Sequence, residues 1–187
     1  MIVTPIAPRA LPASPLLNTT RSFYQVLDAP APLAGMKYPS ERPWPWIDLQ
    51  AAGFNSVVCL TDSIPRYDPA PLQLLYAAGF QDQLGMSAPT DPIREAEMLV
   101  EVVDRVCDEL VAGRGVVVHC QGGTGRTGTV LACALRAMGV PIEKVLAYLG
   151  LINRSRGKAP GWPESAWQQR QVEGFQRRVD KDIQPSI

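Results

Sequence analysis

The feature that most constrains this chain is the segment Val116–Thr127, which reads Val-Val-Val-His-Cys-Gln-Gly-Gly-Thr-Gly-Arg-Thr. The run of valines indicates a buried strand, and the apolar pattern of residues 126–138 indicates a helix. A cysteine and a glycine-rich stretch, Cys120–Gly125, connect the two. Ligands of open α/β sheets bind at the carboxyl ends of the parallel strands. The segment therefore predicts a ligand-binding turn between a strand and a helix.

The residue types in this turn indicate a site for an anion. Glycines let the loop curl so that its backbone N–H groups converge, and the helix N-terminus adds unpaired donors and a partial positive charge. Phosphate is the usual guest of such a cradle. The same donors and Arg126 favour the thiolate of Cys120, which is the nucleophilic form. The planar fork of Arg126 can hold two phosphate oxygens, and Thr127 can offer its hydroxyl to the sulfur and help it depart.

The rest of the chain predicts alternating strands and helices. Strands are expected at residues 22–27, 33–36, 55–60 and 116–119, and helices at 45–52, 72–78, 92–112, 126–138, 141–153 and 163–179. Asp91 is placed to cap the helix over 92–112, with Pro92 at its first position. The alternation predicts an α/β protein with a mostly parallel central sheet flanked by helices. We expect a flexible N-terminal arm over residues 1–20 and a single domain over residues 21–187.

Composition excludes several classes of protein. Eighteen basic residues balance eighteen acidic ones, so no bulk positive field points to nucleic acid or to a membrane surface. No apolar run approaches the roughly 20 residues that span a bilayer, and we expect a soluble, cytoplasmic protein. The cysteines form no CxxC pair and His119 is the single histidine, so no metal and no cofactor are expected. Cys59, Cys107 and Cys133 lie in apolar segments, as small core residues do.

The order His119-Cys120-x5-Arg126-Thr127, with Gly122 and Gly125 inside, resembles the signature loop of protein tyrosine and dual-specificity phosphatases. The resemblance covers about residues 22–180 and fits the compact, atypical dual-specificity branch. It implies the tyrosine phosphatase fold and hydrolysis of phosphotyrosine, phosphoserine or phosphothreonine in proteins through a phosphocysteine. Phosphate, sulfate or vanadate would occupy the same loop as active-site anions. The implied phosphate-binding residues are Gln121, Gly122, Gly123, Thr124, Gly125 and Arg126.

The same resemblance implies a general acid, which the family supplies as an aspartate roughly thirty residues before the cysteine. Asp91 stands at that distance, directly before the long predicted helix. The Asp-Gly or Trp-Pro-Asp context that is usual in the family is absent, and a plain helix N-cap is the alternative interpretation of Asp91. Asp82 is the reserve candidate and Asp62 a more distant one.

Two further residues take supporting roles by resemblance. His119 would be buried and would brace the backbone of the cysteine, which differs little from an ordinary core histidine. Gln168 would position the water that hydrolyses the intermediate, with Gln169 and Gln171 as competitors and a solvated helix face as the alternative. The basic cluster of Arg154, Arg156 and Lys158 either attracts an anionic substrate or is a solvated helix end.

Other functions stay open on the sequence alone. The same chemistry could act on a phosphoinositide, a nucleotide or an RNA 5′ end, although the uncharged residues 121–125 favour a phosphoprotein or a small phosphoester. A phosphate-binding module without turnover is a second alternative. A reductase or sulfur-transfer enzyme is a third, but the other cysteines have no evident placement as a resolving thiol.

Overall fold

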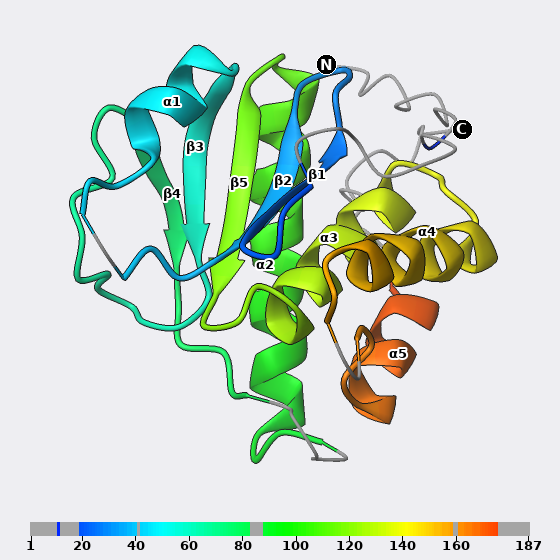
Figure 1. Cartoon of the computed structure of the whole chain (residues 1–187). Coiled ribbons are helices and arrows are strands. Elements are labelled where there is room, and N and C mark those ends of the chain that lie inside the picture. Colours follow the sequence, from blue (N-terminus) through cyan, green and yellow to red (C-terminus); the bar gives the residue numbers. More distant parts are fainter. Residues whose placement is uncertain (1–10, 12–18, 41, 83–87, 159–160, 176–187) are drawn as a thin grey trace, which may run out of the picture.

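The computed structural model describes residues 11, 19–40, 42–82, 88–158 and 161–175 (Figure 1). Its five-stranded sheet has the order β1-β2-β5-β3-β4. The strands are β1 (Phe23–Leu27), β2 (Leu33–Lys37), β3 (Phe54–Cys59), β4 (Gln73–Ala77) and β5 (Gly115–Cys120). The helices are α1 (Trp46–Ala51), α2 (Pro92–Val111), α3 (Gly125–Ala137), α4 (Ile142–Ser155) and α5 (Ala166–Glu173).

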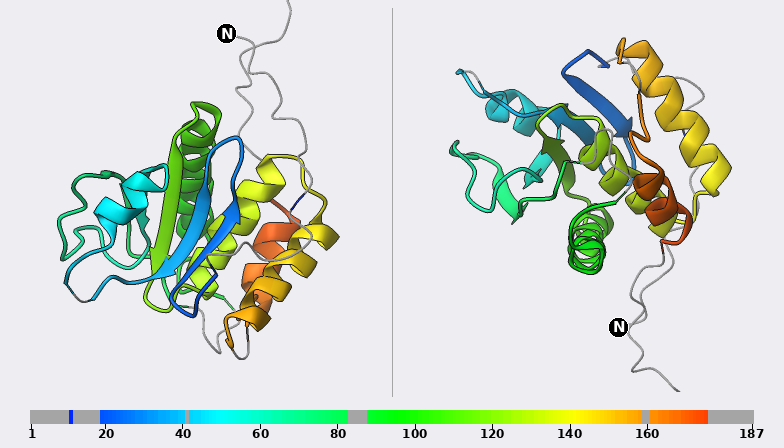
Figure 2. Two further views of the ribbon diagram at one scale, coloured as in Figure 1. Left: turned by 45° about the horizontal axis from the view of Figure 1, so that its top comes forward. Right: turned by 90° about the horizontal axis from the view of Figure 1, so that it is seen from below.

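The sheet is mixed but mostly parallel, because β1 pairs antiparallel with β2 while β2, β5, β3 and β4 pair in parallel. Helix α1 packs against β3 on one face, and α2 and α3 pack against β5 on the other (Figure 2). Within the described ranges, no helix has both the length and the apolar composition needed to cross a membrane. The α/β architecture predicted from the sequence is confirmed.

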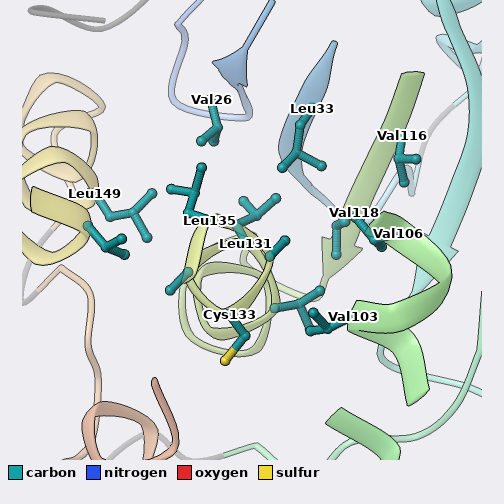
Figure 3. Packing of buried hydrophobic residues seen from close by; sticks show 14 of the residues in the cluster. Val26, Leu33, Val103, Val106, Val116, Val118, Leu131, Cys133, Leu135 and Leu149 are labelled. Atoms are coloured by element: carbon teal, nitrogen blue, oxygen red, sulfur yellow. The ribbon is translucent and has the colours of Figure 1, made fainter. Parts of the chain in front are cut away.

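The central strand β5 is buried on both faces, which explains its unbroken apolar sequence. Val116 and Val118 point into the large core that also holds Leu131 and Leu135 of α3 (Figure 3). Val117 points to the opposite face and joins a smaller core beneath α1. Packing on both faces fixes the register of β5 and thereby the position of the residues that follow it.

The predicted helix over residues 72–78 is wrong, because this segment forms the edge strand β4. Gln73 pairs with Ser56 and Ala77 pairs with Cys59 of β3, in parallel. The segment is rich in leucine and alanine, which favour helices. Backbone pairing with β3 outweighs that local preference, as tertiary context commonly does for short segments.

The last predicted helix, over 163–179, is too long at its start. Helix α5 begins only after Ser165, whose side chain accepts a hydrogen bond from Gln168 N and so caps it. The helix ends at Glu173, with Gly174 as its C-cap, so the prediction is too long at this end too, and residues 176–179 lie outside the described part of the chain. The remaining predicted elements are confirmed to within one or two residues at most ends. Most of the predicted arm over 1–20 is not described, and a single domain over 21–187 stays a prediction.

Parallel pairing brings three connections to one edge of the sheet. The carboxyl ends of β3, β4 and β5 all point to the lower edge in Figure 1. Cys120 ends β5, Asp62 follows β3 and Asp82 follows β4. Residues far apart in the sequence therefore meet where ligands of α/β sheets bind.

Candidate active site

The loop that follows Cys120 curls tightly against β2. Gly123 has φ +67°, and a Cβ at this position would lie 2.5 Å from the Met36 carbonyl group. Only glycine fits both the left-handed backbone and the close approach to β2. The Cys120 side chain is 2% exposed at the base of the loop, while Gln121 and Gly122 lie on the surface.

The helix that follows the loop begins with unpaired backbone donors. Thr124 is the N-cap of α3, and its own side chain makes no capping hydrogen bond. The first backbone bond that closes the turn runs from Gly128 N to Thr124 O at 2.7 Å. The N–H groups of the first turn have no partner inside a helix. Residues Gly125–Thr127 therefore present the donors and the positive end of a helix dipole beside Cys120.

Arg126 reaches from α3 to the segment after β4. Its Nη1 donates to Phe80 O at 3.0 Å, and its Nη2 forms an ion pair with Asp82 Oδ2 at 3.0 Å. The Arg126 side chain is 11% exposed, whereas that of Asp82 is 61% exposed. The guanidinium is therefore held in the interior of the site, with a carboxylate at its outer side.

Helix α2 holds the backbone directly before Asp82. Gln81 N donates to the buried Glu95 carboxylate at 2.7 Å, and Thr90 N donates to Gln81 Oε1 at 2.7 Å. Burial raises the pKa of Glu95, against the lowering effect of the hydrogen bond from Gln81. These contacts with α2 and with the segment before it fix the backbone that leads to Asp82.

The other two aspartates considered in the sequence have different surroundings. Asp91 is exposed, and its Oδ1 accepts a hydrogen bond from Arg94 N at 3.0 Å as the N-cap of α2. Asp62 Oδ2 accepts from the Thr61 hydroxyl at 3.0 Å, after β3. Of the three aspartates, Asp82 is the one in contact with Arg126.

His119 is fully buried between two tyrosine rings. Its Nε2 lies 2.5 Å from the Tyr67 hydroxyl, and the ring of Tyr38 packs edge-on against it. Burial lowers the pKa of His119 to about 4, so the ring is neutral near pH 7. The Cys120 backbone acts on the ring and raises its pKa against the effect of burial, although Nδ1 has no partner among the described residues that meets the geometric criterion for a hydrogen bond. The bracing of the Cys120 backbone stays a prediction.

The segment between α4 and α5 supports the loop through residues whose role the sequence did not show. Arg156 is 3% exposed, donates to Gly123 O at 3.0 Å and lies over the Tyr24 ring at 3.9 Å. Lys158 Nζ donates to Gly122 O at 3.2 Å. The three residues of the basic cluster therefore have different surroundings. Arg156 and Lys158 contact the loop, whereas Arg154 is exposed near the end of α4. Spacing alone could not distinguish a buried arginine from a solvated one.

Glu164 is a residue that the sequence analysis missed. Its half-buried carboxylate lies against Gly125, in the space that a Cβ would occupy. Burial and then the nearby Asp82 raise the pKa of Glu164, while Arg126, Lys158 and a hydrogen bond from the Gly125 backbone lower it.

Gln168 lies beside the same glycine, and its predicted role in positioning water stays a prediction. It is 1% exposed, and its Oε1 accepts from Glu164 N at 2.8 Å. Its Nε2 would be 2.8 Å from a Cβ at Gly125 and has no hydrogen-bond partner in the described structure. Gln169 instead donates to Glu173 on the exposed side of α5. Gln168 is thus better placed than Gln169 to act at the loop.

Thr127 does not make the contact that the sequence suggested. Its hydroxyl is fully buried in the first turn of α3, yet it forms no hydrogen bond with any described residue, the Cys120 sulfur included. A contribution of Thr127 to sulfur departure is not visible in this structure.

Comparison with known proteins shows which family and which solved structures this chain is similar to. The family model for the "Swiss Army Knife protein, DSP-PTPase phosphatase domain" matches residues 24–171. The crystal structure of Tk-PTP in the active form is similar at a TM-score of 0.56 and 26% identity, covering 79% of this chain and 92% of that chain.

Two further structures share the fold. Human DUSP28 is similar at a TM-score of 0.54 and 17% identity, covering 76% of this chain and 90% of that chain. PTPMT1, solved in complex with PI(5)P, is similar at a TM-score of 0.52 and 17% identity, covering 76% and 88%. These two likenesses establish the arrangement of elements, and the site must be argued from its own residues.

Proposed function

The chain belongs to the DSP-PTPase phosphatase family, and from this we propose that it hydrolyses phosphotyrosine and phosphoserine or phosphothreonine in proteins through a phosphocysteine at Cys120. The observation that carries the proposal is the cysteine at the end of β5, followed directly by a curled glycine loop and by the start of α3, whose second residue is Arg126. We propose that residues 21–187 act as one phosphatase domain. The four free cysteines support a reducing, cytoplasmic setting.

In the first step the Cys120 thiolate attacks phosphorus, forming a sulfur–phosphorus bond as the ester phosphorus–oxygen bond breaks. Backbone N–H groups of residues 121–126 and the Arg126 fork stabilise the three equatorial oxygens. A general acid gives its proton to the departing oxygen, so the alcohol or phenol leaves neutral.

We assign the general acid to Asp82 in preference to Asp91. Asp82 is exposed to an incoming substrate and touches Arg126, which would hold the phosphate. Asp91 is engaged as the cap of α2. A proton donor must lie within hydrogen-bond reach of the leaving oxygen, and proximity to the phosphate clamp favours Asp82.

In the second step water attacks the phosphocysteine, the sulfur–phosphorus bond breaks, and inorganic phosphate leaves with the thiolate restored. Asp82, now ionised, takes the proton of the water. The unpartnered Nε2 of the buried Gln168 supports its role in orienting this water beside Gly125.

A phosphoinositide is the second candidate substrate. Lys158 at the rim of the loop supports it, since its ammonium group lies on Gly122 O and would face an additional negative group of a substrate. The uncharged side chains within the loop favour the phosphoprotein. Turnover of matched phosphopeptides and phosphoinositides at equal concentration separates the two.

The Cys120→Ser variant tests the proposal itself. The alcohol is a far weaker nucleophile than the thiolate, so turnover of p-nitrophenyl phosphate should fall by roughly 10⁴-fold or more. The same variant should still bind sulfate, because the loop donors and Arg126 remain. Retention of full activity would refute the mechanism, and wild-type protein without turnover would favour a phosphate-binding module.

A further inference from the structure

The geometry points to Glu164 as an internal competitor of the substrate phosphate: its carboxylate uses donors that a bound phosphate also needs, and so it sets how tightly the loop holds a dianion. This inference rests on the proposed phosphate cradle and adds to it a residue that determines affinity. Glu164 lies outside the signature loop, just before α5.

The contact with Gly125 is the first part of the case. Gly125 opens α3, and the side chain of its N-cap residue Thr124 makes no capping hydrogen bond. A hydrogen bond joins the Gly125 backbone to the Glu164 carboxylate. A Cβ on Gly125 would collide with Oε2 and lie 2.9 Å from Cδ of Glu164. The carboxylate therefore sits against the N-terminal donors that make the loop an anion site.

The charges around Glu164 are the second part. The charged and titratable groups that face it come from several elements, and they are Asp82, Arg126, Lys158, Arg156 and Tyr24, together with the amide of Gln168. Arg126 attracts both Glu164 and Asp82, and it would also attract the phosphate. A bound dianion and an ionised Glu164 therefore repel each other across shared cationic donors.

The direction of the pH dependence follows from this repulsion. Burial and Asp82 already raise the pKa of Glu164, and a bound dianion would raise it further, so binding is coupled to proton uptake. At low pH the protonated carboxyl does not compete. As pH rises through its pKa, Glu164 ionises and anion affinity falls.

A purely structural role gives the opposite result. If Glu164 only braced Gly125, replacing its carboxylate would loosen the loop and weaken anion binding. If it competes, Glu164→Gln removes the charge, keeps the shape and strengthens binding near neutral pH. The sign of the change therefore distinguishes the two roles.

The experiment measures sulfate binding by calorimetry to the Cys120→Ser protein, with and without Glu164→Gln, from about pH 5 to about pH 8, where sulfate stays a dianion and serine does not titrate. We expect Glu164→Gln to bind sulfate roughly tenfold more tightly at the upper end and to lose most of the pH dependence. Glu97→Gln removes one exposed charge from α2 and should change sulfate binding little.

Unchanged or weaker sulfate binding in the Glu164→Gln protein would overturn the inference while leaving the proposed function intact. Absence of sulfate binding in the Cys120→Ser protein itself would instead remove the phosphate cradle, and both proposals with it. A second measurement uses the active enzyme, in which Glu164→Gln should lower the inhibition constant of inorganic phosphate. An equal or higher inhibition constant would count against competition.

Discussion

The two connections that meet Arg126 are built in different ways. The loop after β5 is shaped by its own residues, since Gly123 has φ +67° and Gly125 leaves room for a neighbouring carboxylate. The segment after β4 is placed by contacts from elsewhere, with Phe80 O on Arg126 and Gln81 N on Glu95. The glycines of the first loop are a local sequence signal, although Arg156 and Lys158 from beyond α4 also hold the loop, whereas the second segment is placed only by contacts from elsewhere in the fold.

The largest expected effect tests whether Asp82, in the segment after β4, is the general acid. Asp82→Asn removes the proposed proton donor and should lower kcat by roughly 10³-fold on an aryl phosphate with a poor leaving group. Asp91→Asn keeps an N-cap acceptor and should change kcat and stability little. Steady-state kinetics on both variants decide between the two residues. A large loss of kcat confined to Asp91→Asn would identify Asp91 as the general acid.

The next effect tests how far the glycines of the first loop determine its shape. Gly123→Ala must adopt a left-handed backbone, which costs roughly 1–2 kcal/mol, and its Cβ meets the Met36 backbone as well. Gly113 has φ +75°, and a Cβ there would meet no atom within 4 Å, so Gly113→Ala isolates the backbone cost. We expect Gly123→Ala to lower the unfolding free energy more than Gly113→Ala does.

Enzyme kinetics compare the same two variants in a second way. Displacing the loop donors by about 1 Å should reduce kcat/KM by roughly 10²-fold in Gly123→Ala, whereas Gly113→Ala should retain its turnover. Equal stability and equal kinetics for the two variants would show that the loop tolerates a side chain at residue 123.

The smallest effect concerns the hydrogen bond from Gln81 N to Glu95, which holds the segment after β4. Glu95→Met removes the acceptor of Gln81 N while keeping much of the buried volume, and should lower kcat several-fold by loosening Asp82. The rate at which iodoacetate alkylates Cys120 should stay unchanged, because the loop after β5 does not depend on this bond. Glu97→Met on the exposed side of α2 is the control. A parallel loss of alkylation would show that the two connections are not independent.

The same contrast explains what the sequence could and could not predict. The strand, loop and helix around Cys120 were predicted closely because periodicity, glycines and a helix start are local signals. Strand β4 was mistaken for a helix because its leucine-rich sequence favours one and only pairing with β3 decides otherwise. The partner of Arg126 is set by where β4 ends.

The residues between α4 and α5 that contact the loop after β5 could not all be predicted from the sequence. Gln168 was predicted from the family resemblance, and the structure brings it to Gly125. Arg156 and Glu164 had no such pattern, since a buried arginine and a half-buried glutamate look like surface residues in a charged stretch. Their roles follow from the loop carbonyl and amide groups that they contact.

The covalent intermediate is the most direct test of the proposed chemistry. Wild-type protein mixed with a phosphorylated substrate and quenched rapidly in acid should carry phosphate on the peptide that contains Cys120. With a substrate whose leaving group departs without an acid, the Asp82→Asn variant should form the phosphocysteine normally and hydrolyse it slowly, so it should carry more of the label. The Cys120→Ser variant should carry none. Turnover without any labelled Cys120 peptide, or label on another residue, would contradict the account.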